Sequence, residues 1–329
     1  MPTRRHFLAT SSLAAAGLAL APLAACSQEA PRPAATPGAP PAPSAPAPRA
    51  APAAGTMLTR AIPATGEQIP VIGVGTSGSY EVALDSPDFE ALRQVVRIFF
   101  DGGGRVIDTS PNYSNAEDVV GALLAEDGLR ARCFLATKLA ADDRAALEAQ
   151  WADSLRRLRT DRVELLQVHN LRNWQQAMPY ARELKAQGLV KYTGLTHFQA
   201  DAHAELERVM RAEKPDFIQV NYSVRAPEAA QRLLPAAQDQ GVAVIVNRAF
   251  DDGKLFAQAR GKDLPGWAAE TGITSWSQMF LKFAISHPAV TVVIPATGKP
   301  ERQADQVLAG QGALLTQAQQ DEVTAMFRG

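Results

Sequence analysis

The sequence predicts one α/β domain folded as a (β/α)8 barrel, the TIM-barrel architecture, over residues 56–329. Two observations lead to this prediction. Short apolar segments alternate with longer amphipathic segments, which is typical of a parallel sheet covered by helices. Several apolar segments end on one polar residue, and this barrel carries its chemistry at the C-terminal ends of its strands. Eight repeats favour closure, and no G-x-G-x-x-G pattern follows the first strand as in a doubly wound sheet.

Residues 1–25 precede the fold and have the order of an export signal. Arg4 and Arg5 are followed by an apolar run from about Leu13 to Leu23, which is too short to span a bilayer. This form resembles the signal of the twin-arginine (Tat) pathway, whose export machinery carries folded proteins. The alternative is a chance Arg-Arg pair before an apolar stretch.

The segment Leu23-Ala24-Ala25-Cys26 resembles a bacterial lipobox, in which the cysteine becomes the lipidated first residue. The alternative is an ordinary Ala-x-Ala cleavage site. Residues 26–55 then form a linker, because nine of the chain's 23 prolines lie within 31–55 and such a segment is an extended spacer. We therefore expect an exported protein, periplasmic or at the cell surface, that is anchored to the membrane by a lipid at Cys26.

The domain divides into strand–helix repeats. We expect strands near 71–75, 104–108, 133–137, 164–168, 192–195, 216–220, 242–246 and 290–294. We expect helices near 88–101, 115–126, 143–158, 174–187, 200–212, 226–239 and 274–286, with more after 300. The helix 274–286 ends there because Pro288 disfavours helix in the residue before it.

Two local signals add to this alternation. Segment 57–70, with Thr65-Gly66 at its centre, predicts a hairpin that plugs the bottom of the barrel. Ser114-x-x-Glu117 has the form of a capping box at the start of the second helix.

Composition disfavours several classes of function. The net charge is −1, and four basic residues but only one acidic residue lie in the first 55 positions, so the domain is mildly acidic. Such a domain is a poor candidate for binding nucleic acid. Cys133, the only cysteine besides Cys26, lies in an apolar strand and is expected in the core. Neither a disulfide framework nor a metal site is expected.

Polar residues at three strand ends form a set with one tyrosine. Asp108 ends the second strand, Lys138 follows the third, His169 follows the fourth, and Tyr113 lies five residues past Asp108. Singly, an Asp, a Lys or a His at a strand end is more often part of an ion pair or a satisfied polar group. Their joint occurrence in neighbouring repeats favours a catalytic site.

The motifs around these residues resemble the aldo-keto reductase family over nearly all of residues 57–310. The matching segments are 108–113, 136–138, 154–169, 188–196, 219–223 and 281–295. The resemblance implies a barrel enzyme that reduces the carbonyl of a small aldehyde or ketone with NADP(H), with NAD(H) as the alternative cofactor.

The roles that the family assigns agree with the chemistry of the four residues. A free phenol has a pKa of about 10, and a neighbouring ammonium favours its deprotonated form while a carboxylate keeps that ammonium charged. Tyr113 is expected to give the proton to the growing alkoxide, with Lys138 beside it and Asp108 holding Lys138. His169 is expected to donate a hydrogen bond to the carbonyl oxygen and orient the substrate.

The resemblance also implies cofactor-binding residues. It points to Thr76 and Asp108, and it puts Thr196, His197 and Gln219 at the nicotinamide carboxamide. Asn247 stands where the family often has an aromatic residue under the nicotinamide, and it cannot stack.

Further along the cofactor, Arg248 is expected to reach the pyrophosphate. The segment 294–306 is similar to the family's adenosine-phosphate site, and Ala296 replaces its usual lysine, which weakens the expected preference for NADP(H). There the resemblance puts Arg302 against the adenine and the 2′-phosphate, and Thr297 on that phosphate at a helix N-terminus. Asp305 and Gln306 are expected to contact the adenine. The alternative is that Lys299 and Arg302 form a solvated helix face.

Other functions stay open. A non-catalytic nicotinamide-binding subunit or sensor keeps the same barrel and pocket. A metal-dependent isomerase or hydrolase is disfavoured, because it needs several convergent carboxylates or histidines and only Asp108 and His169 qualify. The expected substrate loops contain four aromatic residues, Tyr80, Trp174, Phe256 and Trp267, which predicts a partly aromatic pocket without selecting a substrate.

Overall fold

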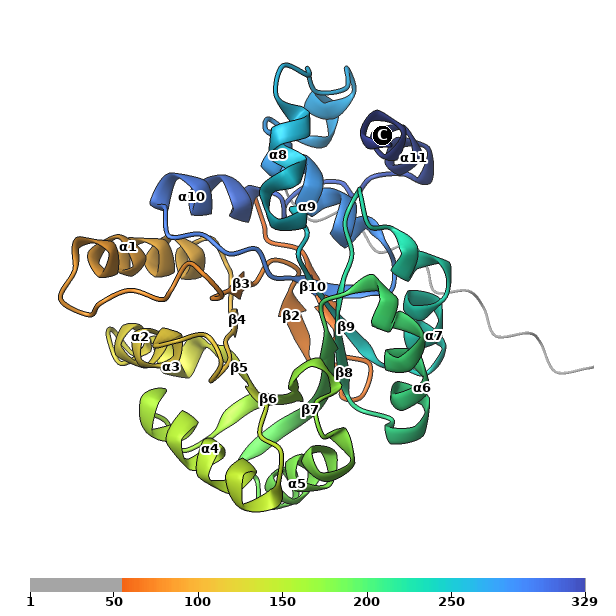
Figure 1. Ribbon diagram of the computed structural model, residues 1–329. Coiled ribbons are helices and arrows are strands. Elements are labelled where there is room, and N and C mark those ends of the chain that lie inside the picture. Colours follow the sequence, from red (N-terminus) through yellow and green to blue (C-terminus); the bar gives the residue numbers. More distant parts are fainter. Residues whose placement is uncertain (1–54, 329) are drawn as a thin grey trace, which may run out of the picture. The chain divides into compact units, whose positions relative to one another are not determined.

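A computed structural model describes residues 55–328, and its centre is a ring of eight parallel strands (Figure 1). In ring order they are β3 (Val74–Gly75), β4 (Val106–Asp108), β5 (Phe134–Leu139), β6 (Val163–Val168), β7 (Val190–His197), β8 (Phe217–Asn221), β9 (Ala243–Asn247) and β10 (Val290–Val293). Each strand pairs in parallel with the next one along the chain. All eight coincide with predicted strands to within a few residues.

Backbone hydrogen bonds close the ring between its first and last strands. Gly73 N donates to Val293 O at 2.8 Å, and Gly75 N donates to Pro295 O at 2.9 Å. A Cβ at Gly73 would lie 3.0 Å from the carbonyl oxygen of Val106, and one at Gly75 would lie 2.9 Å from that of Ile294. The two glycines therefore allow the first strand to approach both neighbours, and the predicted barrel is confirmed.

Helices surround the ring (Figure 1). The predicted helices correspond to α1 (Pro87–Asp101), α2 (Ala116–Leu124), α4 (Arg144–Arg157), α5 (Trp174–Ala186), α6 (His203–Glu213), α7 (Leu233–Asp239), α9 (Trp276–Ser286), α10 (Pro300–Leu308) and α11 (Gln317–Phe327). Two short helices, α3 (Leu129–Arg132) and α8 (Lys254–Ala259), were not predicted. Helix α9 ends at Ser286, as the proline at position 288 predicts. No helix in the described range 55–328 is long and apolar enough to cross a membrane.

The predicted hairpin is present and closes the N-terminal end of the barrel. Strands β1 (Thr59–Ala61) and β2 (Gln68–Pro70) pair antiparallel, and Ile62 and Ile69 are buried against the barrel residues Phe134, Tyr192 and Phe217. Arg60, on β1, donates to the carbonyl oxygens of Ile285 and His287, both at 2.7 Å, and so satisfies the C-terminal end of α9.

The predicted capping box is wrong. Ser114 has a left-handed φ of 46°, and α2 begins after Asn115 without a side-chain cap. Glu117 points inward instead, where its carboxylate accepts hydrogen bonds from Thr137 Oγ1 at 2.6 Å and Ser154 Oγ at 3.1 Å. Burial raises the pKa of Glu117 above its usual value, although these hydrogen bonds oppose the shift. Glu117 therefore ties α2 to β5 and α4 rather than capping α2.

The predicted signal and Cys26 lie outside the described residues, as does nearly all of the linker. Cys133 is buried, as expected for a core cysteine.

Candidate active site

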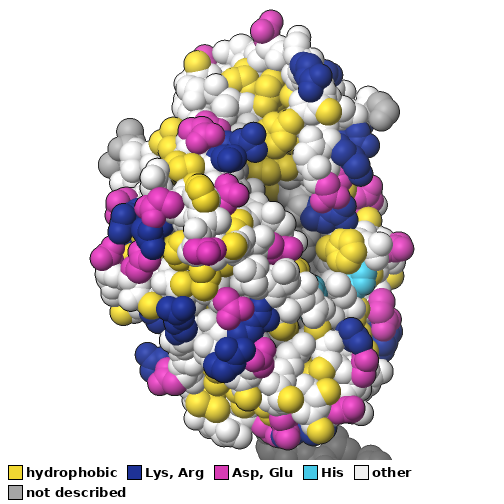
Figure 2. Space-filling view, turned by 60° about the vertical axis from the view of Figure 1, so that its left-hand side comes forward, with side chains coloured by type: hydrophobic (Ala, Val, Ile, Leu, Met, Phe, Trp, Pro, Cys, Tyr) yellow, Lys and Arg dark blue, Asp and Glu magenta, His cyan; other side chains and the backbone are white. Residues whose placement is uncertain are grey.

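A cavity of about 820 Å³ opens at the C-terminal ends of the barrel strands. Its walls come from the loops after β3, β4, β6, β7, β9 and β10, and from the end of β8. Figure 2 shows a hollowed face bordered by hydrophobic side chains and by adjacent basic and acidic ones. This is the end of a (β/α)8 barrel where strand-end residues converge, so the predicted catalytic set should meet in this cavity.

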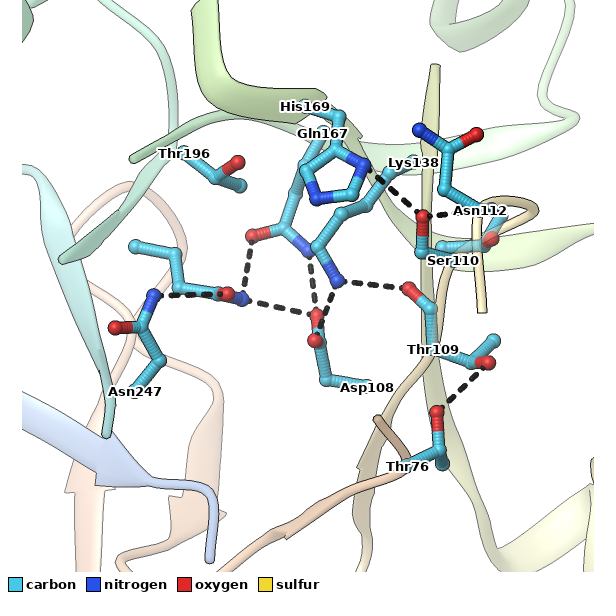
Figure 3. A network of polar contacts seen from close by, with 12 residues as sticks. Thr76, Asp108, Thr109, Ser110, Asn112, Lys138, Gln167, His169, Thr196 and Asn247 are labelled. Carbon is cyan, nitrogen blue, oxygen red and sulfur yellow. Dashed lines mark hydrogen bonds and ion pairs between the residues drawn. The ribbon is translucent and has the colours of Figure 1, made fainter. Parts of the chain in front are cut away.

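A buried ion pair lies at the floor of the cavity (Figure 3). Lys138 Nζ is 2.6 Å from Asp108 Oδ2 and donates to the carbonyl oxygen of Thr109 at 2.8 Å. The two side chains are 1% and 3% exposed. Burial is the largest single influence and on its own lowers the pKa of Lys138. The charges and hydrogen bonds of Asp108 and Tyr113 together outweigh it, so the pKa is raised and the amine stays charged.

The second oxygen of Asp108 is held by two glutamines. Gln167 Nε2 donates to Asp108 Oδ1 at 2.7 Å, and Gln219 Nε2 donates to the same atom at 3.0 Å. Gln219 Oε1 accepts in turn from Asn247 Nδ2 at 3.3 Å. Both carboxylate oxygens are therefore engaged within the protein, which fixes Asp108 as a partner of Lys138.

Tyr113 and His169 lie on the cavity above this pair. Lys138 Nζ is 5.1 Å from the centre of the Tyr113 ring. The Tyr113 and His169 rings meet edge to face, with centroids 5.7 Å apart, and both side chains line the cavity. Burial, together with the positive charges of Lys138 and His197, lowers the pKa of His169 to about 3. The His169 imidazole is therefore neutral at ordinary pH, and the structure brings the four predicted residues to one place.

Seven of the predicted cofactor residues also line the cavity: Thr76, Asp108, Thr196, Gln219, Asn247, Arg248 and Arg302. The buried oxygen Asn247 Oδ1 has no hydrogen-bond partner within residues 55–328. It is therefore an acceptor available to a ligand in the cavity.

Four predicted cofactor residues do not line the cavity: His197, Thr297, Asp305 and Gln306. His197 stacks on Phe198, with ring centroids 5.8 Å apart. Asp305 accepts from Ser275 Oγ at 2.7 Å and from Gln278 Nε2 at 2.6 Å, so it binds the start of α9. Thr297 and Gln306 are buried, and Thr297 Oγ1 accepts from the backbone N–H of Lys299 at 3.2 Å.

Arg248 is already paired within its own loop. Its guanidinium forms an ion pair with Asp252 and lies 5.3 Å from the centre of the Phe198 ring. Both Arg248 and Asp252 have left-handed φ angles, of 54°. A phosphate that binds Arg248 therefore competes with Asp252.

The predicted aromatic residues are mostly elsewhere. Of the four, only Phe256 lines the cavity, and Tyr80 is fully buried. Phe198 and Phe250 line it instead, and the rings of Phe250 and Phe256 are 4.9 Å apart. The pocket is partly aromatic, as expected, but through different side chains.

Sequence reasoning missed two polar residues of the site. Gln167 interrupts the apolar strand β6 two positions before His169, which is a signal that a polar partner is near. Ser110, in the turn before Tyr113, lies 3.1 Å from His169 Nδ1. Within the described part of the chain, no cluster of three or more His, Cys, Asp or Glu side chains has the arrangement of a metal site.

Comparisons with known proteins agree on one family. Residues 71–327 match the model of the "Aldo/keto reductase family". The aldo-keto reductase YhdN of Bacillus subtilis is 29% identical over 207 residues, which cover 58% of this chain and 61% of the relative. The D-threo-aldose 1-dehydrogenase of a Pseudomonas species is 26% identical over 239 residues, which cover 60% of this chain and 71% of the relative.

Solved structures show the same architecture. A Klebsiella pneumoniae aldo/keto reductase in complex with NADP and acetate is 26% identical, with a TM-score of 0.66, over 80% of this chain and 93% of its own. A Klebsiella pneumoniae aldo-keto reductase in complex with NADPH is 25% identical, with a TM-score of 0.68, over 80% and 92%. The family model covers most of the chain, and the cavity carries the residue set that the motifs predicted. The chain therefore belongs to the aldo/keto reductase family.

Proposed function

We propose that the protein is an NADP(H)-dependent oxidoreductase that reduces the carbonyl group of small aldehydes or ketones. One observation carries this proposal: Tyr113 and His169 face one cavity directly above the buried Asp108–Lys138 pair. Family membership supports it, as do the two similar Klebsiella structures that hold NADP or NADPH.

The residues suggest how the reaction proceeds. Tyr113 and His169 hold the substrate's carbonyl oxygen between them, and the neutral His169 donates a hydrogen bond that orients it. When bound, the nicotinamide cofactor supplies the hydride for the carbonyl carbon. Tyr113 then gives its proton to the oxygen, and the charge of Lys138 favours the phenolate that remains. Asp108 holds Lys138 charged and in place.

The cavity fits a dinucleotide in several respects. Thr76, Thr196 and Gln219 line it. Asn247 Oδ1, which has no hydrogen-bond partner within the described part of the chain, offers an acceptor to a carboxamide N–H or a ribose hydroxyl. Arg302 lies on the wall formed by α10 and offers a cation to a phosphate.

The direct test is turnover of a generic aldehyde such as 4-nitrobenzaldehyde with NADPH. Oxidation of NADPH matched by formation of the alcohol supports the enzyme. The second candidate, a non-catalytic nicotinamide-binding subunit or sensor, predicts tight NADPH binding without turnover of any carbonyl in a broad panel. That result would contradict the proposed reaction, because Asp108, Tyr113, Lys138 and His169 would then catalyse no carbonyl reduction.

Cofactor choice is tested at Arg302. Arg302→Ala should weaken NADPH about 10-fold more than NADH, because a guanidinium–phosphate contact is charge-assisted and only NADPH carries the 2′-phosphate. Lys299→Ala is the matched control, since Lys299 is an exposed cation at the start of the same helix that does not line the cavity. Fluorescence titration of the wild type and both variants with each cofactor gives the dissociation constants. Equal losses of affinity for both cofactors would show that Arg302 does not bind the 2′-phosphate.

We also propose that residues 1–25 export the folded protein through the Tat machinery and that Cys26 is then lipidated. The order of the twin arginines, the apolar run and the lipobox-like end supports this proposal. Export of a folded protein would let it carry NADP(H) bound in the cytoplasm.

Cell fractionation tests the export route. Arg4→Lys with Arg5→Lys should leave the protein in the cytoplasm, while the control Arg32→Lys with Arg49→Lys, in the linker, should not. Cys26→Ala should leave the protein exported but released from the membrane, or unprocessed. Export that survives loss of the twin arginines would contradict the Tat route, and exported protein that is uniformly free of nucleotide would contradict the carried cofactor.

A further inference from the structure

Ser110 begins the turn that carries Tyr113. The backbone N–H of Tyr113 donates to the carbonyl oxygen of Ser110 at 3.1 Å, and Pro111 occupies the next position, where its fixed φ suits a turn. The backbone N–H of Asn112 donates to Ser110 Oγ at 3.2 Å. Serine in this place stabilises the turn through both its backbone and its side chain.

The same side chain reaches across to His169. Ser110 Oγ is 3.1 Å from His169 Nδ1, and the serine is fully buried (Figure 3). Ser110 Oγ accepts the N–H of Asn112, and because the hydroxyl is buried its own proton also needs an acceptor. Within residues 55–328, the acceptor that lies within hydrogen-bond distance of this hydroxyl is His169 Nδ1. If Nδ1 carried the proton instead, the buried hydroxyl proton would be left without an acceptor, which is unfavourable.

We propose that Ser110 is a positioning residue that fixes the tautomer of His169, with the proton on Nε2, and that ties His169 to the turn of Tyr113. The proposal rests on the proposed carbonyl reduction for its consequence, but its geometry stands alone. A hydrogen bond at one ring nitrogen sets which nitrogen is protonated. One serine thereby aligns the two side chains that face the substrate oxygen.

The tautomer matters because the imidazole is neutral. The lowered pKa of His169 means that protonation does not supply a second N–H at ordinary pH. With the proton on Nε2, the ring donates to a carbonyl oxygen in the cavity. With the proton on Nδ1, it would present a lone pair to that oxygen, and two acceptors repel.

The test measures the tautomer directly. Nitrogen-15 NMR of the histidines in the full chain, with the His169 signals identified by their loss in His169→Asn, distinguishes a protonated nitrogen from an accepting one. The wild type should show Nε2 protonated and Nδ1 accepting a hydrogen bond. Ser110→Ala should shift the Nδ1 signal to that of a nitrogen without a donor, or mix the tautomers. Ser110→Cys, whose S–H is a weaker donor, should fall between them.

Ser154→Ala is the matched control. Ser154 is also a buried serine whose hydroxyl donates to a side chain, Glu117 Oε2, but it lies on α4. Its loss should lower Tm without moving the His169 signals. A wild type with the proton on Nδ1, or a Ser110→Ala spectrum identical to wild type, would overturn the proposal.

Kinetics supply the second readout. Ser110→Ala should lower kcat by about 10-fold or more with little change in the Kd for NADPH, since a donor to the developing oxyanion is lost or misdirected. An unchanged kcat in Ser110→Ala would overturn the proposed positioning role. If no carbonyl is turned over by the wild type, the proposed function fails, and the NMR result still decides the tautomer.

Discussion

Tyr113→Phe should lower kcat for aldehyde reduction by at least about 100-fold, the lower end for loss of a general acid. The phenylalanine keeps the ring that meets His169 edge to face, so the cavity wall is retained. Only the hydroxyl that delivers the proton is removed. The Kd for NADPH should change by less than about twofold, because cofactor binding uses other walls of the cavity.

A second tyrosine provides the control for this substitution. Tyr222 is buried and stacks on Phe283, with ring centroids 5.5 Å apart, and it does not line the cavity. Tyr222→Phe should leave kcat within about twofold, since no step of the reaction uses its hydroxyl. Steady-state kinetics and NADPH titration give both quantities. If the Tyr113→Phe enzyme keeps most of its activity, Tyr113 is not the proton donor.

The strand ends were predictable because an apolar run that stops on one polar residue is a local signal. Asp108, Lys138 and His169 each follow such a run, and the repeat length shows that the runs are neighbours. Local patterns do not show which buried groups meet across strands. Lys138 is opposite Gln167 in the β5–β6 register, so the Gln167–Asp108 hydrogen bond depends on strand pairing that one sequence does not fix.

Three residues lie elsewhere than their local motifs suggest, and each position has a physical reason. His197 follows Thr196 on β7, and successive side chains of a strand point to opposite faces, so only one of the two faces the cavity. Asp305 meets Ser275 from 30 positions away, which a motif match does not reveal. Ser114-x-x-Glu117 fits a capping box locally, but hydrogen bonds from other elements draw Glu117 inward. Strand alternation decides the first case, and tertiary contacts override a local pattern in the other two.

Lys138→Met should both inactivate and destabilise the protein. It leaves the buried Asp108 carboxylate without its cation, and breaking a buried ion pair costs about 3–5 kcal/mol. The more exposed pair Lys185–Asp216 has the same 2.6 Å separation, and its two side chains are 40% and 13% exposed. Lys185→Met, the matched control, should cost less than about 1 kcal/mol. Denaturant unfolding gives both values, and equal losses would show that burial of the Lys138–Asp108 pair has no special cost.

Two further measurements separate the loss of charge from the loss of packing in Lys138→Met. They are the pH dependence of its stability and the stability of the double variant with Asp108→Asn. The folded pKa of Lys138 is raised above its ordinary 10.5, so its stabilising effect is complete below that pH and is lost as pH rises through the folded value. The stability gap between wild type and Lys138→Met should therefore stay constant from about pH 6 to about pH 9 and shrink only in stronger alkali. Adding Asp108→Asn should recover part of the lost stability, because the uncompensated charge is removed, but not the activity, because Tyr113 still lacks its cation. A double variant as unstable as the sum of the single losses would mean that the two side chains do not act as a pair.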